Sequence, residues 1–124
     1  MIYLDTHVLV ALYAGELDRL GAAARTSIDS EELVVSPAAI LELELLHEIR
    51  RLKMPAQKLI SDLGLQIGLR VSDLPFQTVV QTALTEKWGR DPFDRLIVAN
   101  AKANNASLVT NDQRIHRHYS RAIW

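Results

Sequence analysis

Carboxylates are the side chains whose positions in this sequence point most clearly to chemistry. Asp5 directly follows the short apolar segment 2–4, and Asp112 follows soon after the apolar pair 108–109. If both segments are parallel strands, the two acids lie at the carboxyl edge of one sheet, where α/β proteins bind ligands. Each acid also has an ordinary structural interpretation. Asp5 would cap the next helix, in competition with Thr6, and Asp112 would belong to a turn.

Glu42 stands apart from the other glutamates of its predicted helix. Helical spacing places it on one face with three apolar residues, Leu45, Leu46 and Ile49. Glu44 and Glu48 fall on a different face and are interpreted as solvated. A carboxylate on an apolar face is strongly destabilising unless a cation or a hydrogen-bond network accompanies it. A buried salt bridge and a metal site both meet that requirement.

Asp94 belongs to the segment Asp91-Pro92-Phe93-Asp94, which has the pattern of a helix start with Asp91 as the cap. Asp94 shares a helical face with three apolar residues, Ile97, Val98 and Ala101. The spacing therefore directs Asp94 inward, at the end of the sheet. We expect the helix N-terminus to keep this carboxylate ionised, as suits a metal ligand.

The elements that must position these acids alternate along the chain. Apolar runs predict strands at 2–4, 33–35, 70–71 and 108–109. Helical spacing and Pro or Gly boundaries predict helices at 7–14, 17–27, 37–51, 55–68, 75–88 and from 92 onward. Strands separated by helices of this length imply an α/β fold with a mainly parallel sheet flanked by helices.

Composition limits the classes of protein to consider. The 124 residues are 48% hydrophobic and 23% charged, as expected for one globular domain spanning 1–124. The absence of Cys excludes disulfides, thiolate catalysis and zinc-finger or iron–sulfur sites, so a metal would need oxygen or His ligands. The four His residues lack zinc-site spacing. No apolar run suits a signal peptide or a membrane span, so we expect a cytoplasmic protein.

Charge is unevenly distributed along the chain. Residues 87–124 hold seven Lys or Arg residues against three acids, although the whole chain has a net charge of −1. A basic surface with embedded acids can attract a polyanion while holding a cation. A solvated surface of helix-end cations is the alternative interpretation. Trp88 and Trp124 are interpreted as packing residues rather than base-stacking platforms.

Three motifs together resemble the PIN-domain nucleases, and specifically their VapC toxin branch. They are IYLDTHVLVALY, SPAAILELELL and RDPFDRLIVANAKANNASLVTND, and they lie in a chain of similar length. The resemblance implies a PIN-like three-layer fold. It also implies a quartet of acids with nearby threonines as polar support, which here are Asp5, Glu42, Asp94, Asp112, Thr6 and Thr110. The resemblance implies no more for Asp91 than the role of a helix cap.

The same resemblance implies metal-dependent endonucleolytic cleavage of RNA, pairing as a homodimer and silencing by a small VapB-type antitoxin. Carboxylates held close together repel one another, and Mg²⁺ or Mn²⁺ would neutralise them and lower the pKa of bound water. Asp5 and Asp94 are the expected direct ligands. Asp112 would bind through water or a second ion, and Glu42 would orient the attacking water or hold that ion. Arg95 and Arg114 are expected to hold RNA phosphates.

Two other classes of function compete with this interpretation. A phospho-receiver domain has similar length and an acidic Mg²⁺ pocket, but it needs paired acids after the first strand, where Asp5 stands alone. A catalytically silent interaction module of the same fold would not require all four acids. Within the nucleases, DNA cleavage and general RNA processing stay open, since no residue here reads a 2′-hydroxyl.

Overall fold

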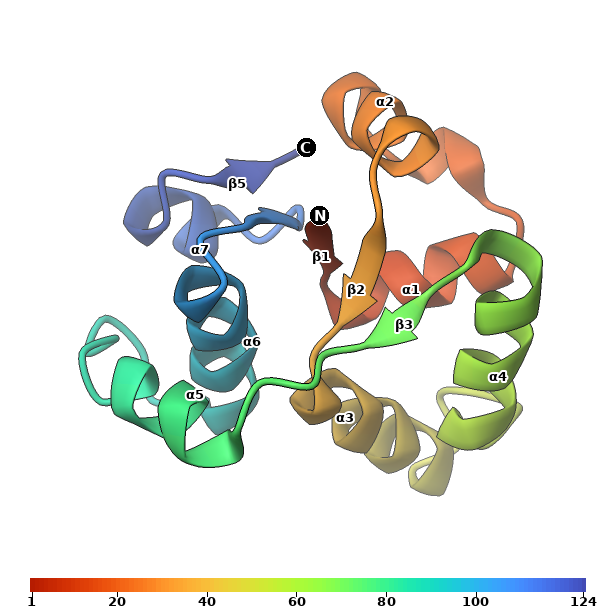
Figure 1. The fold of residues 1–124 in the computed structure, drawn as a ribbon. Coiled ribbons are helices and arrows are strands. Elements are labelled where there is room, and N and C mark those ends of the chain that lie inside the picture. The colour runs from red at the N-terminus through yellow and green to blue at the C-terminus, as the bar shows by residue number, and fades with distance from the viewer.

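The computed structural model describes residues 1–124 and contains one sheet in the order β3-β2-β1-β4-β5, with every neighbouring pair parallel (Figure 1). The strands are β1 (Ile2–Leu4), β2 (Leu33–Val35), β3 (Arg70–Val71), β4 (Ser107–Val109) and β5 (Ala122–Ile123). The central strand β1 pairs with β4 from the opposite end of the sequence, Tyr3 lying beside Leu108. The predicted α/β fold with a parallel sheet is confirmed.

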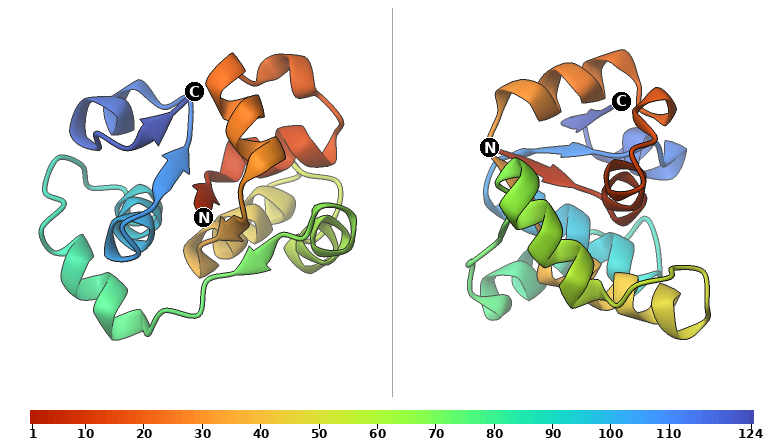
Figure 2. Two further views of the ribbon diagram at one scale, coloured as in Figure 1. Left: turned by 45° about the horizontal axis from the view of Figure 1, so that its top comes forward. Right: turned by 90° about the vertical axis from the view of Figure 1, so that its right-hand side faces the viewer.

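Helices cover both faces of this sheet, and Figure 2 shows α2 and α5 on opposite sides of β1. The α-helices are α1 (Thr6–Tyr13), α2 (Ala22–Ser30), α3 (Pro37–Glu48), α4 (Ala56–Ile67), α5 (Phe76–Ala83), α6 (Pro92–Ala103) and α7 (Gln113–His118). A 3₁₀ turn spans Leu17–Arg19. None of the helices combines the length and apolar character that crossing a bilayer requires.

The core lies between the sheet and helix α6. All three β1 residues are fully buried, and the α6 residues Ile97, Val98 and Ala101 are buried as well. Because these three residues share a face with Asp94, the predicted inward orientation of that face is confirmed. Burial of this apolar area fixes the helix against the sheet and thereby fixes the position of its N-terminus.

The structure differs from the predicted elements in three places. The predicted helix 17–27 is divided at Gly21, which is extended and lies so close to Trp124 that a Cβ would sit 2.4 Å from its carbonyl carbon. The predicted helix 75–88 ends at Ala83, and beyond this end the buried Glu86 accepts a hydrogen bond from Lys102. Helix α7 and strand β5 were not predicted, since each is too short to show a clear period.

The predicted apolar face of α3 is partly wrong. The helix buries Ala39 and Leu43, whereas Leu45 and Ile49 are 39% and 61% exposed. Glu42 lies beside the buried face, one turn after Ala39, and is half-buried. Helical spacing gives the relative positions of side chains, but the neighbours of the helix decide which of its faces turns inward.

Glu44 has a structural role that the sequence did not reveal. Its Oε1 accepts a hydrogen bond of 3.0 Å from the Ala56 N–H, in the first turn of α4, where Pro55 provides no side-chain cap. We expect Glu44→Ala to destabilise the fold by about 1 kcal/mol, because the N–H loses its partner. Urea unfolding measures this change. Glu48→Ala, at an exposed position of the same helix, is the control, and equal losses in both variants would contradict the capping role.

Candidate active site

Asp5 occupies the end of the central strand β1 and is the N-cap of α1. It is 7% exposed, and each of its carboxylate oxygens accepts one hydrogen bond. The Thr6 N–H donates to Oδ1 at 2.8 Å, and the Thr110 hydroxyl donates to Oδ2 at 2.6 Å. The capping role and the strand-end position that the sequence offered as alternatives are therefore both present in one residue.

Glu42 reaches the same place from α3. The Thr6 hydroxyl donates to Glu42 Oε1, so the residue that follows Asp5 links the two carboxylates. Glu42 forms no salt bridge in the structure. The buried salt bridge that its sequence position allowed is thus absent, and its second oxygen is available to another ligand.

Asp112 follows β4 and is the N-cap of α7. Its Oδ1 accepts hydrogen bonds from the backbone N–H groups of Arg114 and Ile115, at 2.8 and 3.1 Å. Its own N–H donates to the Thr110 hydroxyl at 3.1 Å, so Thr110 connects Asp112 with Asp5. The ring Nε2 of His116 lies 2.6 Å from the Thr110 carbonyl oxygen and holds this turn in place. No spacing in the sequence indicated this contact.

Asp94 lies in the first turn of α6, immediately behind the cap Asp91. Asp91 Oδ1 accepts hydrogen bonds from the N–H groups of Phe93 and Asp94, at 2.8 and 3.2 Å, as the sequence predicted. The half-buried carboxylate of Asp94 accepts no hydrogen bond from the protein. It is the acid of the group with most unused capacity to bind a ligand.

Burial and mutual repulsion raise the pKa values of three of these acids. Burial raises the pKa of Asp5, although hydrogen bonds from Thr110 and Thr6 oppose it. Burial also raises the pKa of Glu42 against the Thr6 hydrogen bond, with Asp5 and Asp91 adding repulsion. The pKa of Asp94 rises to about 7 through burial and through the charges of Asp91, Asp5, Asp112 and Glu42. The structure therefore brings the four predicted acids within electrostatic reach of one another.

This result corrects one prediction for Asp94. The helix N-terminus is expected to keep its carboxylate ionised, but burial and the neighbouring acids outweigh the helix dipole and raise its pKa to about 7. The dipole is worth at most about 2 kcal/mol and is confined to the first turn. The repulsion among several like charges in a partly buried pocket is larger than this dipole energy.

The donor set of this pocket fits a hard divalent cation. No three His, Asp or Glu side chains are arranged to hold a metal ion as the side chains stand. The available donors are nevertheless all carboxylate oxygens, the ligands that Mg²⁺ and Mn²⁺ prefer. Asp94 accepts no hydrogen bond, and Asp112 Oδ2 and Glu42 Oε2 are likewise unused. A cation would offset the repulsion that raises the pKa of Asp94.

Arg95 and Arg114 contact backbone carbonyl groups rather than the acids. Arg95 Nη2 donates to the Ala83 carbonyl oxygen at 2.9 Å, at the end of α5. Arg114 Nη2 donates to the Trp88 carbonyl oxygen, also at 2.9 Å, and its Cζ lies 6.0 Å from the Trp88 ring centroid. Phosphate binding by either residue stays a prediction.

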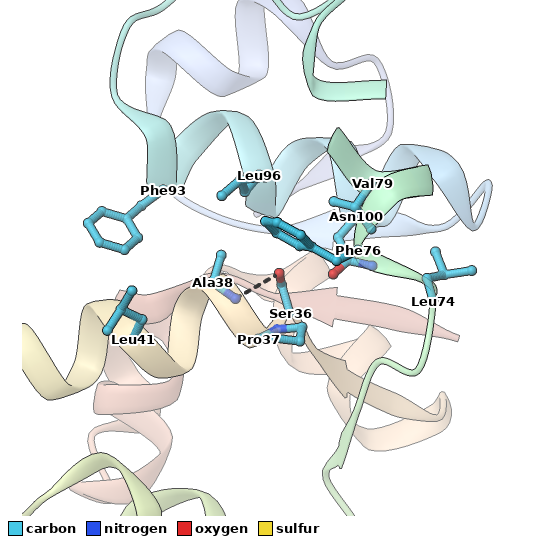
Figure 3. Close-up of a pocket in the computed structure, with 10 residues that line it drawn as sticks. All are labelled: Ser36, Pro37, Ala38, Leu41, Leu74, Phe76, Val79, Phe93, Leu96 and Asn100. Carbon is cyan, nitrogen blue, oxygen red and sulfur yellow. Dashed lines mark hydrogen bonds between the residues drawn. The ribbon is translucent and has the colours of Figure 1, made fainter. Parts of the chain in front are cut away.

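An apolar cleft of about 280 Å³ lies between α3 on one side and α5 and α6 on the other, apart from the acids (Figure 3). Leu41, Phe76 and Phe93 are among the residues along its walls, and Leu41 and Phe76 are 56% and 70% exposed. Its polar members include Ser36, whose hydroxyl accepts a hydrogen bond from the Ala38 N–H at 3.2 Å. The cleft lacks the charged groups that RNA cleavage would need.

The solved structures most useful for comparison share the whole fold. A VapBC2 complex from Rickettsia felis, bound to a promoter DNA fragment, matches with a TM-score of 0.60 at 21% identity, covering 100% of this chain and 98% of that one. A toxin–antitoxin complex from Klebsiella pneumoniae matches with a TM-score of 0.67 at 14% identity, covering 100% and 97%. At these identities the likeness concerns the fold.

Two sequence comparisons define the family. The PIN domain family model matches residues 2–120. Ribonuclease VapC22 of Mycobacterium tuberculosis is 33% identical over an alignment 122 residues long, and the match covers 94% of this chain and 92% of that protein. The acids at the carboxyl edge of the sheet lie within the matched region. The chain therefore belongs to the PIN-domain family, in the branch of the VapC ribonucleases.

Proposed function

We propose that this chain is a VapC-type toxin that hydrolyses RNA phosphodiester bonds with the aid of Mg²⁺ or Mn²⁺. The observation that carries the proposal is the gathering of Asp5, Glu42, Asp94 and Asp112 at one edge of the sheet, where burial and the neighbouring charges raise the pKa of Asp94. RNA as the substrate is supported by the ribonuclease to which the chain is 33% identical. The cut would be internal, as in an endoribonuclease.

The contacts of each side chain indicate its role in the proposed reaction. Asp5, Asp94 and Asp112 would hold the cation, which when bound would acidify water and neutralise phosphate charge. Glu42, fixed by the Thr6 hydroxyl, has a free oxygen that would accept a proton from the attacking water. Thr110 keeps Asp5 and Asp112 at a constant separation. The basic C-terminal third would attract the RNA backbone, so binding should weaken as salt increases.

Two protein partners follow from this proposal. The solved relatives include VapBC complexes, which supports a VapB-type antitoxin as the partner. We also propose a homodimer, supported by the apolar side chains that α3 and α5 expose beside the cleft of Figure 3. A toxin that cuts cellular RNA would act in the cytoplasm.

Incubation of purified protein with total cellular RNA tests the proposal without assuming a target sequence. We expect discrete fragments with Mg²⁺ or Mn²⁺ and none with EDTA, because the acids need a cation to act. Sequencing of the fragment ends then maps the cleavage site. Asp29→Asn, an exposed acid on α2, is the control for protein quality and should cut as wild type does.

Two outcomes would contradict the proposal. Equal cleavage with EDTA and with metal would show that the cation is dispensable. No cleavage, together with no rise in melting temperature on adding Mn²⁺, would favour a catalytically silent interaction module, since a cation that binds only the folded protein must stabilise it.

A further inference from the structure

The loop at 84–91 joins α5 to α6 and leads directly into the turn that carries Asp94. Glu86, 4% exposed, fastens this loop to α6: its Oε1 accepts a hydrogen bond from Lys102 Nζ at 2.7 Å. Its Oε2 accepts one from Trp88 Nε1 at 2.6 Å. The indole ring of Trp88 is therefore linked through Glu86 to Lys102, in the last turn of α6.

Helix α7 contacts the same indole through one of its own side chains. His118 stacks on Trp88 with ring centroids 5.4 Å apart and planes 8° from parallel. Arg114, one helical turn earlier, donates to the Trp88 carbonyl oxygen at 2.9 Å. Its guanidinium also lies along Gly89, where an added Cβ would meet Arg114 Cζ at 3.7 Å. We call Trp88, Arg114 and His118 the Trp88 clasp.

The clasp joins α7 to the loop that precedes α6, and each of these helices begins at an acidic cap. Helix α7 starts at its cap Asp112, two residues before Arg114, and α6 starts at Asp91, three residues after Trp88. Strand β4 follows α6 and precedes α7, so both helices are anchored to the sheet, and the clasp adds a direct side-chain link between the residues just before Asp91 and the first turn of α7. A change in the clasp would therefore shift Asp94 against Asp112.

We propose that Arg114 is a positioning residue, which acts through the Trp88 clasp to hold Asp94 and Asp112 at the separation that a shared cation requires. This inference rests on the proposed function and assigns to Arg114 a role other than phosphate binding. A planar guanidinium suits this role because it donates to a carbonyl group and lies along the loop at the same time. The ammonium group of Lys has the same charge but lacks this planar shape.

Two Arg114 variants and a matched control test the proposal. Arg114→Gln removes the charge and the clasp, Arg114→Lys keeps the charge, and Arg117→Gln removes an equal charge from an exposed position of α7 without clasp contacts. Mg²⁺ affinity is measured from the NMR amide shifts of Asp94 and Asp112. The kcat and KM are measured on an RNA containing a cleavage site mapped with wild type.

We expect both Arg114 variants to weaken Mg²⁺ binding and lower kcat by about tenfold or more relative to Arg117→Gln. The KM of Arg114→Gln should equal that of Arg117→Gln, because each removes one charge from the basic C-terminal third. Arg114 is exposed, so circular dichroism should show all three variants folded. An Arg114→Lys protein that matches wild type, or an Arg114→Gln protein that raises KM alone, would overturn the inference and favour a phosphate contact. A wild type that neither binds Mg²⁺ nor cuts RNA would overturn the proposed function itself and this inference with it.

Discussion

Replacing Asp94 with Asn is expected to abolish metal-dependent RNA cleavage and, in the same protein, to raise the melting temperature measured without metal. The expected fall in kcat is about a thousandfold or more, because the carboxylate with most unused binding capacity would be lost from the site. A substitution that removes activity while adding stability distinguishes a functional carboxylate from a structural one.

The sign of the stability change follows from the pKa of Asp94. Burial and four neighbouring acids raise this pKa to about 7, whereas the unfolded chain titrates near 4. The folded protein therefore retains a proton that the unfolded chain releases, and the stability of the metal-free protein falls as the pH rises from about 4 to about 7. At pH 8 the folded wild type carries the full repulsion, which Asn lacks.

We expect this relief to be worth about 1–2 kcal/mol, a value reduced for partial exposure, and to raise the melting temperature by roughly 3–8 °C at pH 8. At pH 4 the difference should nearly vanish. Differential scanning calorimetry at both pH values, with and without Mg²⁺, measures it. Wild type should gain stability from Mg²⁺ and the variant should not.

Asp29→Asn is the matched control for this experiment, since the same chemical change at an exposed position of α2 should leave both the melting temperature and kcat unchanged. Full activity in Asp94→Asn would remove the residue from the site. A lower melting temperature at pH 8 would show that its carboxylate stabilises the metal-free fold, contrary to the expectation.

Replacing Thr110 with Val should lower both cation affinity and kcat by about 10- to 100-fold, although this residue is not expected to touch the cation. Its buried hydroxyl donates to Asp5 and accepts from the Asp112 N–H. Valine has nearly the same shape but offers neither bond. Asp5 and Asp112 would then each lose the hydrogen bond to this hydroxyl, and the free energy of unfolding should fall by about 1–3 kcal/mol.

Thr110→Ser keeps the hydroxyl and is the control for this prediction. Isothermal titration with Mn²⁺ and cleavage of a mapped RNA site measure the two effects. If Thr110→Ser loses as much activity as Thr110→Val, the loss does not follow the hydroxyl, and the bridging role is wrong.

Much of the acidic site could be predicted because local patterns determine it. Asp5 and Asp112 were placed by the strands they follow, and Asp94 by its spacing from Ile97 and Val98, which the structure buries. The apolar face predicted around Glu42 is partly wrong. The companion residues Leu45 and Ile49 are exposed, and Glu42 reaches the site through the Thr6 hydroxyl.

The contacts that the sequence did not reveal fall outside the regular spacing of helices and strands. The stacking of Trp88 on His118 and the support of the Thr110 carbonyl group by His116 leave no periodic pattern. Helix α7 and strand β5 are short, and tertiary packing stabilises them more than their own composition does. Such contacts depend on the assembled fold.

The pairing of β1 with β4 has a consequence for the timing of synthesis. Ile2 lies beside Ser107, so β1 has no partner on that side until residues 107–109 have been made. Asp5 consequently meets Asp112 only after these residues have left the ribosome, and contacts so distant in sequence form slowly. A chain terminated before Asp112 lacks a complete acidic site, so this topology delays nuclease activity until β4 has been made and has paired with β1.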